Sequence, residues 1–525
     1  MIGLDGFELS LAEEMMEAGE LPALRNLRER SARFLLDHGK AKRTGLAWEH
    51  VSAGYGSEND GRASAVYFDR RTYRVWQSRS KLVPFVTGQP FKTVVFDPPY
   101  FDLEQAVGTQ GIVRWGAHDP GTLRRSTPEG LHEELDRRFG PYPAHSWIYG
   151  FVWPSVQNTR VMGEALVRAT DVRTEIACWL LQERCPDWDL GIIIASEGHS
   201  AAEALWHGID PRHPLHGVPS APAAGEGVRA VYRALDRLID RLARTFPEAD
   251  LVAFNMHGMG TNDSDPGSMA LLAELLYRHS FGKEYMRPRI WSLTDEGVPL
   301  LGEEETWDGV MNELVPMPEK RADSWLEGLL RSFDSSRADD PAEEGEEASQ
   351  DWMPAARYQP FWSRMRAFAL PSFYDGRIRI NLAGRERKGR VPASHYGAVC
   401  DEIEALLRAC RNPLTGAPAV ETVERTGGSN PRRLDPFDCD LVVVWSGGPL
   451  GLAHPELGQM GPLPYRRTGG HTGRYGVAFI SGAGITPGDF GVRSSFDVIP
   501  TVIKLLGGST ASGAQSLFQK IATAA

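Results

Sequence analysis

Short apolar runs that alternate with longer segments of helical periodicity constrain the fold of this chain most. The clearest runs cover residues 190–195, 250–254 and 440–445, and each is apolar at nearly every position. Runs of this kind are typical of parallel strands that are buried on both faces of a sheet. Residues 227–245 repeat apolar side chains at intervals of three and four, which predicts an amphipathic helix. The sequence therefore predicts an α/β fold with a mainly parallel central sheet and helices on both faces.

Further strands and helices are expected on the same grounds. Residues 1–6 end in Asp-Gly and predict a first strand that is short for a central position, so we leave open a natural start upstream of Met1. The remaining predicted strands are residues 93–97, 377–382 and 477–480, and the remaining predicted helices are residues 10–17, 160–184, 396–411 and 494–506.

Two segments depart from this pattern. Residues 60–150 are rich in Arg, Tyr, Phe and Pro and show little periodicity, which predicts an insertion or cap that elaborates a site. Residues 334–351 are acidic and contain Pro and Gly, which is typical of a disordered linker. Residues 1–333 and 352–525 are predicted to form one α/β domain together.

Composition argues against several classes of protein. The formal net charge of −12 argues against binding to a nucleic-acid polymer, since phosphate backbones are bound by clustered Lys and Arg. The five cysteines never occur as CxxC, which indicates a reducing compartment without disulfides. No apolar run approaches the roughly 18 residues that span a bilayer, and the N-terminus lacks a basic and apolar leader. We expect a cytoplasmic protein without a membrane segment.

Polar residues follow the predicted strands in a pattern that suggests a metal site. His199 and Glu203 come after the strand at 190–195 and are spaced i, i+4, so on a helix both project from one face. His257 follows the strand at 250–254. The carboxyl ends of parallel strands are where α/β sheets place their sites. Taken singly, residues of this kind more often have a structural role, such as membership of a surface pair.

Three further residues become informative only in combination. His471 lies in a glycine-rich turn before a predicted strand, and Asp5 lies in a turn that is ordinary unless a cation faces it. Thr44 precedes a glycine, and a Thr at such a place is usually a turn or cap residue. A Thr hydroxyl is a poor nucleophile near neutral pH, but coordination to a metal activates it. The sequence thus raises the question of whether these side chains converge on Thr44.

Several short motifs occur in an order that points to one enzyme superfamily. They are GLDG at 3–6, PALRNL at 22–27, RTGLAWEHVSAG at 43–54, ALWHGIDPRHPLHG at 204–217, LVAFNMHGMG at 251–260, GRIRINLAGRERKGRV at 376–391, DLVVVW at 440–445, GGHTGRYGVAFISGAGI at 469–485 and SSFDVIPTVIKLLG at 494–507. Together they resemble the alkaline phosphatase superfamily, in particular its type I phosphodiesterase/nucleotide pyrophosphatase branch. The resemblance implies an alkaline-phosphatase-like α/β fold.

The resemblance also implies two metal ions, usually zinc, on either side of a Thr nucleophile. Carried over by position, the first site comprises Asp5, Thr44, Met256 and His257, and the second comprises His199, Glu203 and His471.

Two departures from the family pattern affect these sites. The DxxxH pair of the family is exchanged in order here, as His199 and Glu203, which retains the two His and one carboxylate of an open catalytic zinc site. The Asp of the SDHG motif is replaced by Met256, whose soft thioether is a poor ligand for zinc. We therefore expect one or two Zn²⁺ ions, with the first site weakly occupied or empty unless Asn255, Asp263 or Asp265 replaces the missing ligand.

By resemblance, the protein is expected to be a metal-dependent hydrolase of phosphodiester or nucleotide-pyrophosphate-like substrates. Thr44 would be the nucleophile and would form a covalent phosphothreonine, and the partner would be a small phosphorylated molecule. Two alternatives stay open: a transferase that moves a phospho or sulfo group in a biosynthetic pathway, and a degenerate member that binds a ligand without turnover. Met256 supports the last alternative, whereas retention of Thr44 counts against it. The substrate, the acceptor and the oligomeric state are not predicted.

Overall fold

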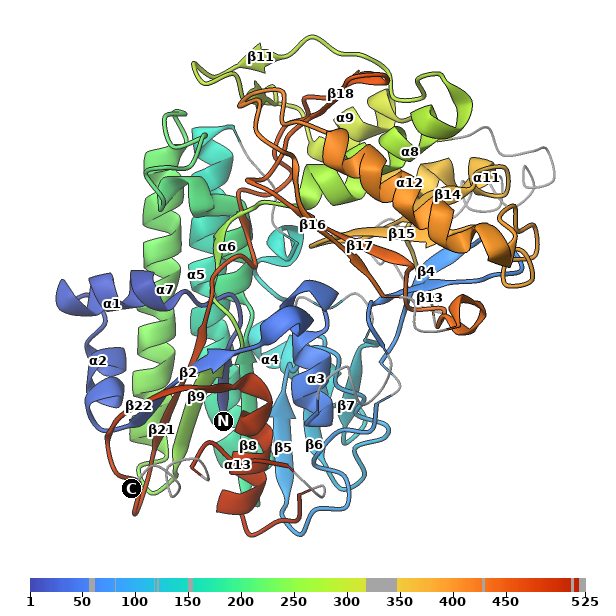
Figure 1. Ribbon diagram of the computed structural model, residues 1–525. Coiled ribbons are helices and arrows are strands. Elements are labelled where there is room, and N and C mark those ends of the chain that lie inside the picture. The colour runs from blue at the N-terminus through green and yellow to red at the C-terminus, as the bar shows by residue number, and fades with distance from the viewer. Residues whose placement is uncertain are drawn as a thin grey trace.

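The computed structural model describes residues 1–55, 62–80, 82–117, 119, 122–149, 154–317, 347–426, 430–510 and 514–518. Its larger lobe contains a nine-stranded sheet (Figure 1). Seven strands run in one direction, while β7 and β21 run in the other, which confirms the predicted mainly parallel sheet. The strand order is β22 (Gly488–Ser494), β2 (Ala32–Asp37), β21 (Gly476–Ser481), β9 (Leu251–Asn255), β1 (Ile2–Leu4), β8 (Leu190–Ala195), β5 (Thr93–Phe96), β6 (Gln110–Val113) and β7 (Arg125–Thr127).

The short first strand lies in the middle of this sheet. β1 pairs in parallel with β8 on one side and with β9 on the other, and all its residues are buried. Pairing on both sides therefore satisfies its backbone in spite of its length. A Cβ added at Gly3 would lie 2.4 Å from the ring of Trp48, so a glycine is needed for the helix that carries Trp48 to pack this closely on β1.

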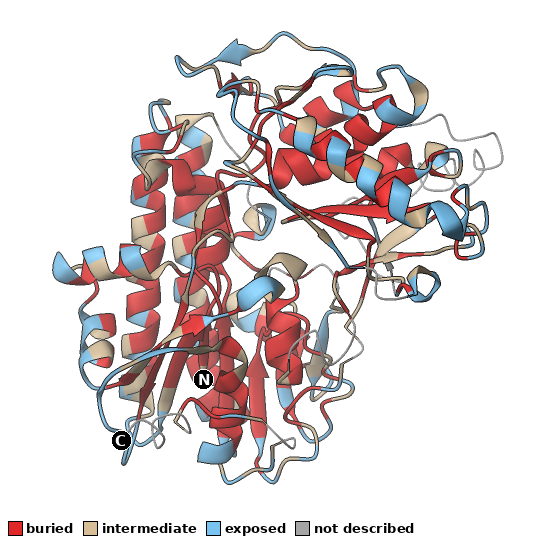
Figure 2. Ribbon diagram, viewed as in Figure 1, coloured by how far each residue is buried: buried red, intermediate tan, exposed pale blue. Residues whose placement is uncertain are grey.

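Helices cover both faces of the sheet, as the sequence predicts. On one face, α5 (Val156–Trp179), α6 (Glu197–Leu205) and α7 (Ala221–Thr245) share an apolar cluster with β1, β8 and β9. On the other face, α3 (Ala47–Ala53) and α13 (Val498–Leu505) pack over a second cluster. Figure 2 shows the central strands buried, with exposed residues along the outer surfaces of the lobe. The first face is completed by α1 (Leu9–Glu17), α2 (Pro22–Glu29) and α4 (Leu131–Phe139).

The prediction that residues 60–150 are an insertion or cap is wrong for much of this region. β5, β6 and β7 are three strands of the central sheet, and α4 packs against its core. β5 confirms the strand predicted at 93–97, whereas β6 and β7 were not predicted, because strands of four and three residues are too short to show a recognisable periodicity. Only the earlier strands β3 (Val66–Phe68) and β4 (Val75–Ser78) lie outside the central sheet.

A smaller lobe is built on a separate antiparallel sheet. Its order is β14 (Ala367–Leu370), β15 (Gly376–Ile380), β17 (Leu441–Trp445) and β16 (Val420–Arg425). The lobe has its own apolar core, which includes α8 (Leu272–Phe281) and α12 (Tyr396–Ala409), and lies at the upper right in Figure 1. The run at 440–445 is therefore buried as predicted but is not a parallel strand, because an apolar run alone does not define strand direction.

The predicted acidic linker falls mostly outside the described residues. Its C-terminal end does not behave as a linker, since β13 (Glu347–Ser349) pairs antiparallel with β4. That residues 1–333 and 352–525 together form one α/β domain stays a prediction. All five cysteines are buried and free. None of the described helices combines the length with the apolar composition that a membrane span requires.

Candidate metal centre

Several predicted ligands lie at one edge of the central sheet. Asp5 follows β1, His199 and Glu203 lie on α6 directly after β8, and His257 follows β9. These strands are parallel, so their carboxyl ends meet at this edge. His471 lies between β20 (Gly469–Gly470) and β21, which is antiparallel to β9 and therefore starts at the same edge.

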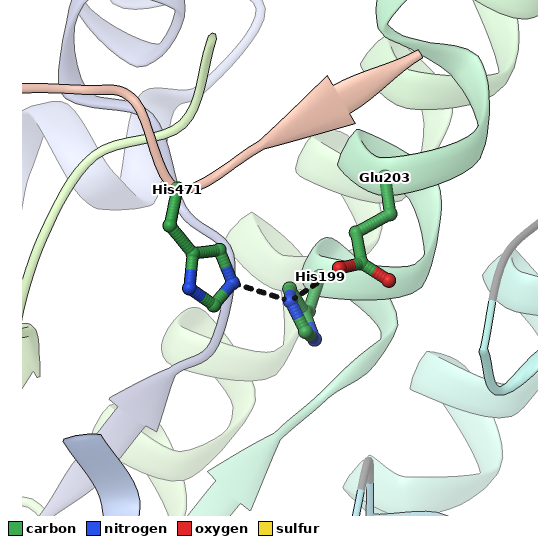
Figure 3. Close-up of side chains that lie close together, drawn as sticks. All are labelled: His199, Glu203 and His471. Atoms are coloured by element: carbon green, nitrogen blue, oxygen red, sulfur yellow. Dashed lines mark hydrogen bonds and ion pairs between the residues drawn. The ribbon is translucent and has the colours of Figure 1, made fainter. Parts of the chain in front are cut away.

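His199, Glu203 and His471 converge on one point (Figure 3). Their candidate ligand atoms all lie within 4.8 Å of one another. Nε2 of His199 is 2.8 Å from Nε2 of His471 and 3.3 Å from Oε1 of Glu203. Ligand atoms bound to one tetrahedral zinc ion at about 2.0–2.1 Å lie about 3.3 Å apart, so this arrangement fits a single ion. Two imidazoles and a carboxylate are also the donor set of an open catalytic zinc site.

Burial keeps the imidazoles of His199 and His257 neutral. It lowers the pKa of His199, although the carboxylate of Asp5, 3.5 Å from Nδ1 of His199, opposes the shift. Burial also lowers the pKa of His257 to about 4. For Asp5, burial raises the pKa of the carboxyl group and His199 opposes this effect. Because a metal binds the neutral imidazole, His199 and His257 are in the binding form at neutral pH.

Close backbone packing fixes α6 against the end of β1. Gly6 has a φ of +66°, and a Cβ added there would lie 2.2 Å from Cα of His199. A Cβ at Gly198 would lie 2.8 Å from the carbonyl oxygen of Asp5. Glycine at both positions therefore allows the helix that carries His199 to approach Asp5 this closely.

A buried ion-pair network anchors the first residue of α6. Arg173 on α5 donates from Nε to both carboxylate oxygens of Glu197 at 3.0 Å, and its Nη2 lies 3.0 Å from Asp97. It also donates to the carbonyl oxygen of Ile194 at 2.8 Å. All three charged side chains are fully buried, so each depends on the others for compensation. The network ties α5, the end of β5 and the start of α6 together.

Arg467 contacts the cluster and was not among the predicted site residues. Its guanidinium is almost fully buried and touches Oε1 of Glu203 through Nη1. Its Nε and Nη2 lie 2.7 and 2.8 Å from the two carboxylate oxygens of Asp265. The sequence did contain a signal, since two arginines lie just upstream of the glycine-rich turn of His471, separated from it by Thr468.

Two rings border His471. The ring centroid of His257 lies 4.3 Å from that of His471, and Tyr374 stacks on His471 at 4.4 Å with an interplanar angle of 18°. The hydroxyl of Tyr374 lies 3.4 Å from Nε2 of His471. Tyr374 comes from the turn between β14 and β15 in the smaller lobe, so both lobes contribute to the site. Nothing in the sequence near Tyr374 indicated this contact.

The hydroxyl of Thr44 bonds within its own turn. Thr44 is the last residue of the 3₁₀ helix η1 (Gly39–Thr44), and Oγ1 donates to the carbonyl oxygen of Ala41 at 2.7 Å. The same oxygen accepts from the amide of Leu46 at 3.1 Å. A Cβ added at the next residue, Gly45, would lie 3.3 Å from the ring of Tyr374, which places the turn beside the ring that stacks on His471. A role as nucleophile would require the hydroxyl to leave Ala41.

Met256 packs as a core residue. It is 3% exposed and belongs to the apolar cluster that also contains Trp48. Two of the residues considered as replacements have other partners: Asn255 donates to the carbonyl oxygen of His257 at 2.6 Å, and Asp265 binds Arg467. The third, Asp263, is exposed.

No family model matches this chain, and no curated protein matches it. Among solved structures, it is similar to phosphonoacetate hydrolase from Sinorhizobium meliloti 1021 in complex with phosphonoformate, at 14% identity and a TM-score of 0.46, over 96% of this chain and 94% of that one. It is also similar to human ectonucleotide pyrophosphatase/phosphodiesterase 5, at 11% identity and a TM-score of 0.45, over 99% and 97%. An inactive form of the murine protein in complex with AMP gives 10% identity and a TM-score of 0.48, over 99% and 98%. At these values the likenesses carry no argument about the chemistry of this site.

Proposed function

We propose that this protein is a metal-dependent hydrolase of phosphodiester or nucleotide-pyrophosphate-like substrates, with Thr44 as its nucleophile. The observation that carries the proposal is the convergence of His199, Glu203 and His471 within 4.8 Å at the carboxyl edge of the sheet. These three residues would hold a Zn²⁺ ion. When bound, the ion would supply positive charge that polarises a phosphoryl oxygen and favours the ionised form of a nearby hydroxyl.

The residues of the chain would carry out the remaining steps. The Thr44 hydroxyl would break its hydrogen bond to Ala41, lose its proton and attack phosphorus in line with the leaving group. The bond to the leaving oxygen would break, and that oxygen would take up a proton, which leaves a phosphothreonine. Water would then hydrolyse this ester and return a proton to the oxygen of Thr44. The motif resemblance supports this sequence of steps.

The substrate class rests on the motif resemblance alone. On that ground we propose a small phosphorylated or nucleotide-like substrate. The cytoplasmic location stays a prediction from the cysteine pattern.

The test is hydrolysis of bis(p-nitrophenyl) phosphate by the purified, zinc-loaded protein. Thr44→Ala should lose at least about 100-fold in kcat. Thr415→Ala is a matched control, because Thr415 is an exposed turn residue whose hydroxyl likewise accepts from the amide two residues on. Activity that persists unchanged in Thr44→Ala would reject the assigned nucleophile.

A non-catalytic role is the second candidate, and two observations favour it. Met256 lies in the apolar core instead of offering a carboxylate, and the Thr44 hydroxyl is engaged with its own turn. This candidate predicts that the zinc-loaded protein binds AMP without releasing any product. Product analysis with added alcohols distinguishes hydrolysis from the transferase alternative.

A further inference from the structure

Arg467 is positioned as a built-in cation beside the candidate zinc site. Its side chain is 3% exposed, and three of the five guanidinium N–H groups meet carboxylates: one at Glu203 and two at Asp265. The contact with Asp265 is two-pronged, which is the geometry that fixes a guanidinium most firmly. The side chain also lies over the ring of Tyr374, with 5.9 Å between Cζ and the ring centroid. Arg467 is therefore held from two sides within the site.

One carboxylate oxygen is shared by the arginine and the candidate metal ligands. Oε1 of Glu203 contacts Nη1 of Arg467 and also lies 3.3 Å from Nε2 of His199. A zinc ion held by His199 and Glu203 would consequently lie within a few ångströms of a guanidinium. Two cations this close repel each other strongly in a buried environment, so Arg467 weakens the binding of any dication here.

The net charge of the surrounding side chains favours the binding of one dication and disfavours a second. Three carboxylates line this region: Asp5 and Glu203 next to His199, and Asp265 next to Arg467. Arg466 also pairs with Asp265, at 3.5 Å. The two arginines already balance most of the negative charge, so one Zn²⁺ makes the site positive and a second would have no carboxylate to offset it. The loss of an acidic ligand at Met256 has the same consequence.

We propose that Arg467 takes the place of the second metal ion, so that the site works with one dication and one guanidinium. A guanidinium suits this task, since it keeps its charge and its planar N–H groups bind phosphate oxygens. Arg467 would therefore be a phosphate-binding residue as well as a partner of Glu203. This inference rests on the zinc site of the proposed function, but it holds whether or not Thr44 is the nucleophile.

The test compares zinc binding in three variants at Arg467, by metal analysis after dialysis and by calorimetric titration. The wild-type protein should bind one equivalent of Zn²⁺. Arg467→Ala and Arg467→Gln remove the repelling charge and release Glu203, so both should bind zinc at least tenfold more tightly and bind inorganic phosphate at least tenfold more weakly. Arg467→Lys keeps the charge and should stay near the wild-type zinc affinity.

Arg278→Ala provides the matched control. Arg278 forms a similarly buried ion pair with Glu274, but in the core of the smaller lobe, so its loss should affect thermal stability and leave zinc affinity unchanged. Two equivalents of zinc in the wild-type protein would overturn the proposal. So would an unchanged or weaker zinc affinity in Arg467→Gln, provided that this variant melts within the range of Arg278→Ala. The turnover of Thr44→Ala tests only the proposed function, and neither its loss nor its retention changes this inference.

Discussion

Nε2 of His199 lies 2.8 Å from Nε2 of His471, although the two residues are 272 positions apart in the sequence. One comes from the helix after β8 and the other from the turn before β21, so the topology of the sheet brings them together. Two imidazole nitrogens at this distance, with the carboxylate of Glu203 beside them, form the only group of three or more such ligands found in the described part of the chain. The following predictions test whether this arrangement binds a metal and what holds it in place.

His471→Ala should abolish zinc binding. The variant removes one of three ligands, and we expect the zinc affinity to fall by more than about 100-fold. Removing a residue that only hydrogen-bonds to a ligand costs less than this. Dialysis against zinc followed by metal analysis measures this directly. His395→Ala is the control, since His395 is exposed and lies on η9 (Ala393–His395) of the smaller lobe. Equal zinc content in both variants would contradict the assignment of the site.

Gly6→Ala should destabilise the protein and damage the site together. The added methyl group would lie 2.2 Å from Cα of His199, so α6 must move, and we expect a loss of about 3 kcal/mol or more in the free energy of unfolding. Gly19→Ala introduces the same left-handed strain, with a φ of +79°, but meets nothing within 4 Å and should cost about 1 kcal/mol. Urea unfolding of the two variants separates the clash from the strain.

Arg173→Met should be among the most destabilising single changes in the larger lobe. It leaves Asp97 and Glu197 buried without their cation, and breaking such a pair costs about 3–5 kcal/mol. Zinc affinity should also fall, because Glu197 begins the helix that carries two ligands. Arg237→Ala breaks an exposed pair with Asp171 and should change stability by less than about 1 kcal/mol. A similar midpoint of urea unfolding in the two variants would contradict this account.

Stability should decrease as the pH falls from 6.5 towards 4, and His50 should account for part of this loss. Burial lowers the pKa of His50 from 6.5 to about 4, and neither of its ring nitrogens has a hydrogen-bond partner among the described residues. Below pH 6.5 the imidazole of His50 is protonated in the unfolded chain but stays neutral in the folded one. Protonation therefore favours the unfolded state, and the free energy of unfolding falls as the pH decreases below 6.5. The contribution reaches about 3 kcal/mol near pH 4. Urea midpoints of the metal-free protein at pH 7 and 4.5 should differ less in His50→Gln than in the wild type.

The sequence predicted the parts of the site that depend on local patterns. The apolar run at 190–195 and the i, i+4 spacing of His199 and Glu203 were enough to place these two side chains on one helix face. Long-range features were out of reach. Strand direction at 440–445 depends on the partner strand, and the contact of Tyr374 with His471 depends on how a second lobe packs.

Two sheet strands in region 60–150 were missed for a different reason. The apolar run at 93–97 predicted β5, but β6 and β7 have four and three residues, too few for a repeat to be recognised. Thr44 shows a further limit. Its motif indicated a role, whereas the structure shows its hydroxyl bound to its own turn, a detail that depends on the conformation of η1.

The division of the site between the two lobes has a consequence for how the protein would respond to its surroundings. His199 and Glu203 lie on α6 at the carboxyl edge of the large sheet, whereas Tyr374 stacks on His471 from a turn of the small one. A shift of one body against the other by an ångström would alter the stacking on His471 before it disturbed either core. Zinc affinity would then depend on the distance between the two lobes. A compound that binds between the lobes and separates them should therefore release zinc.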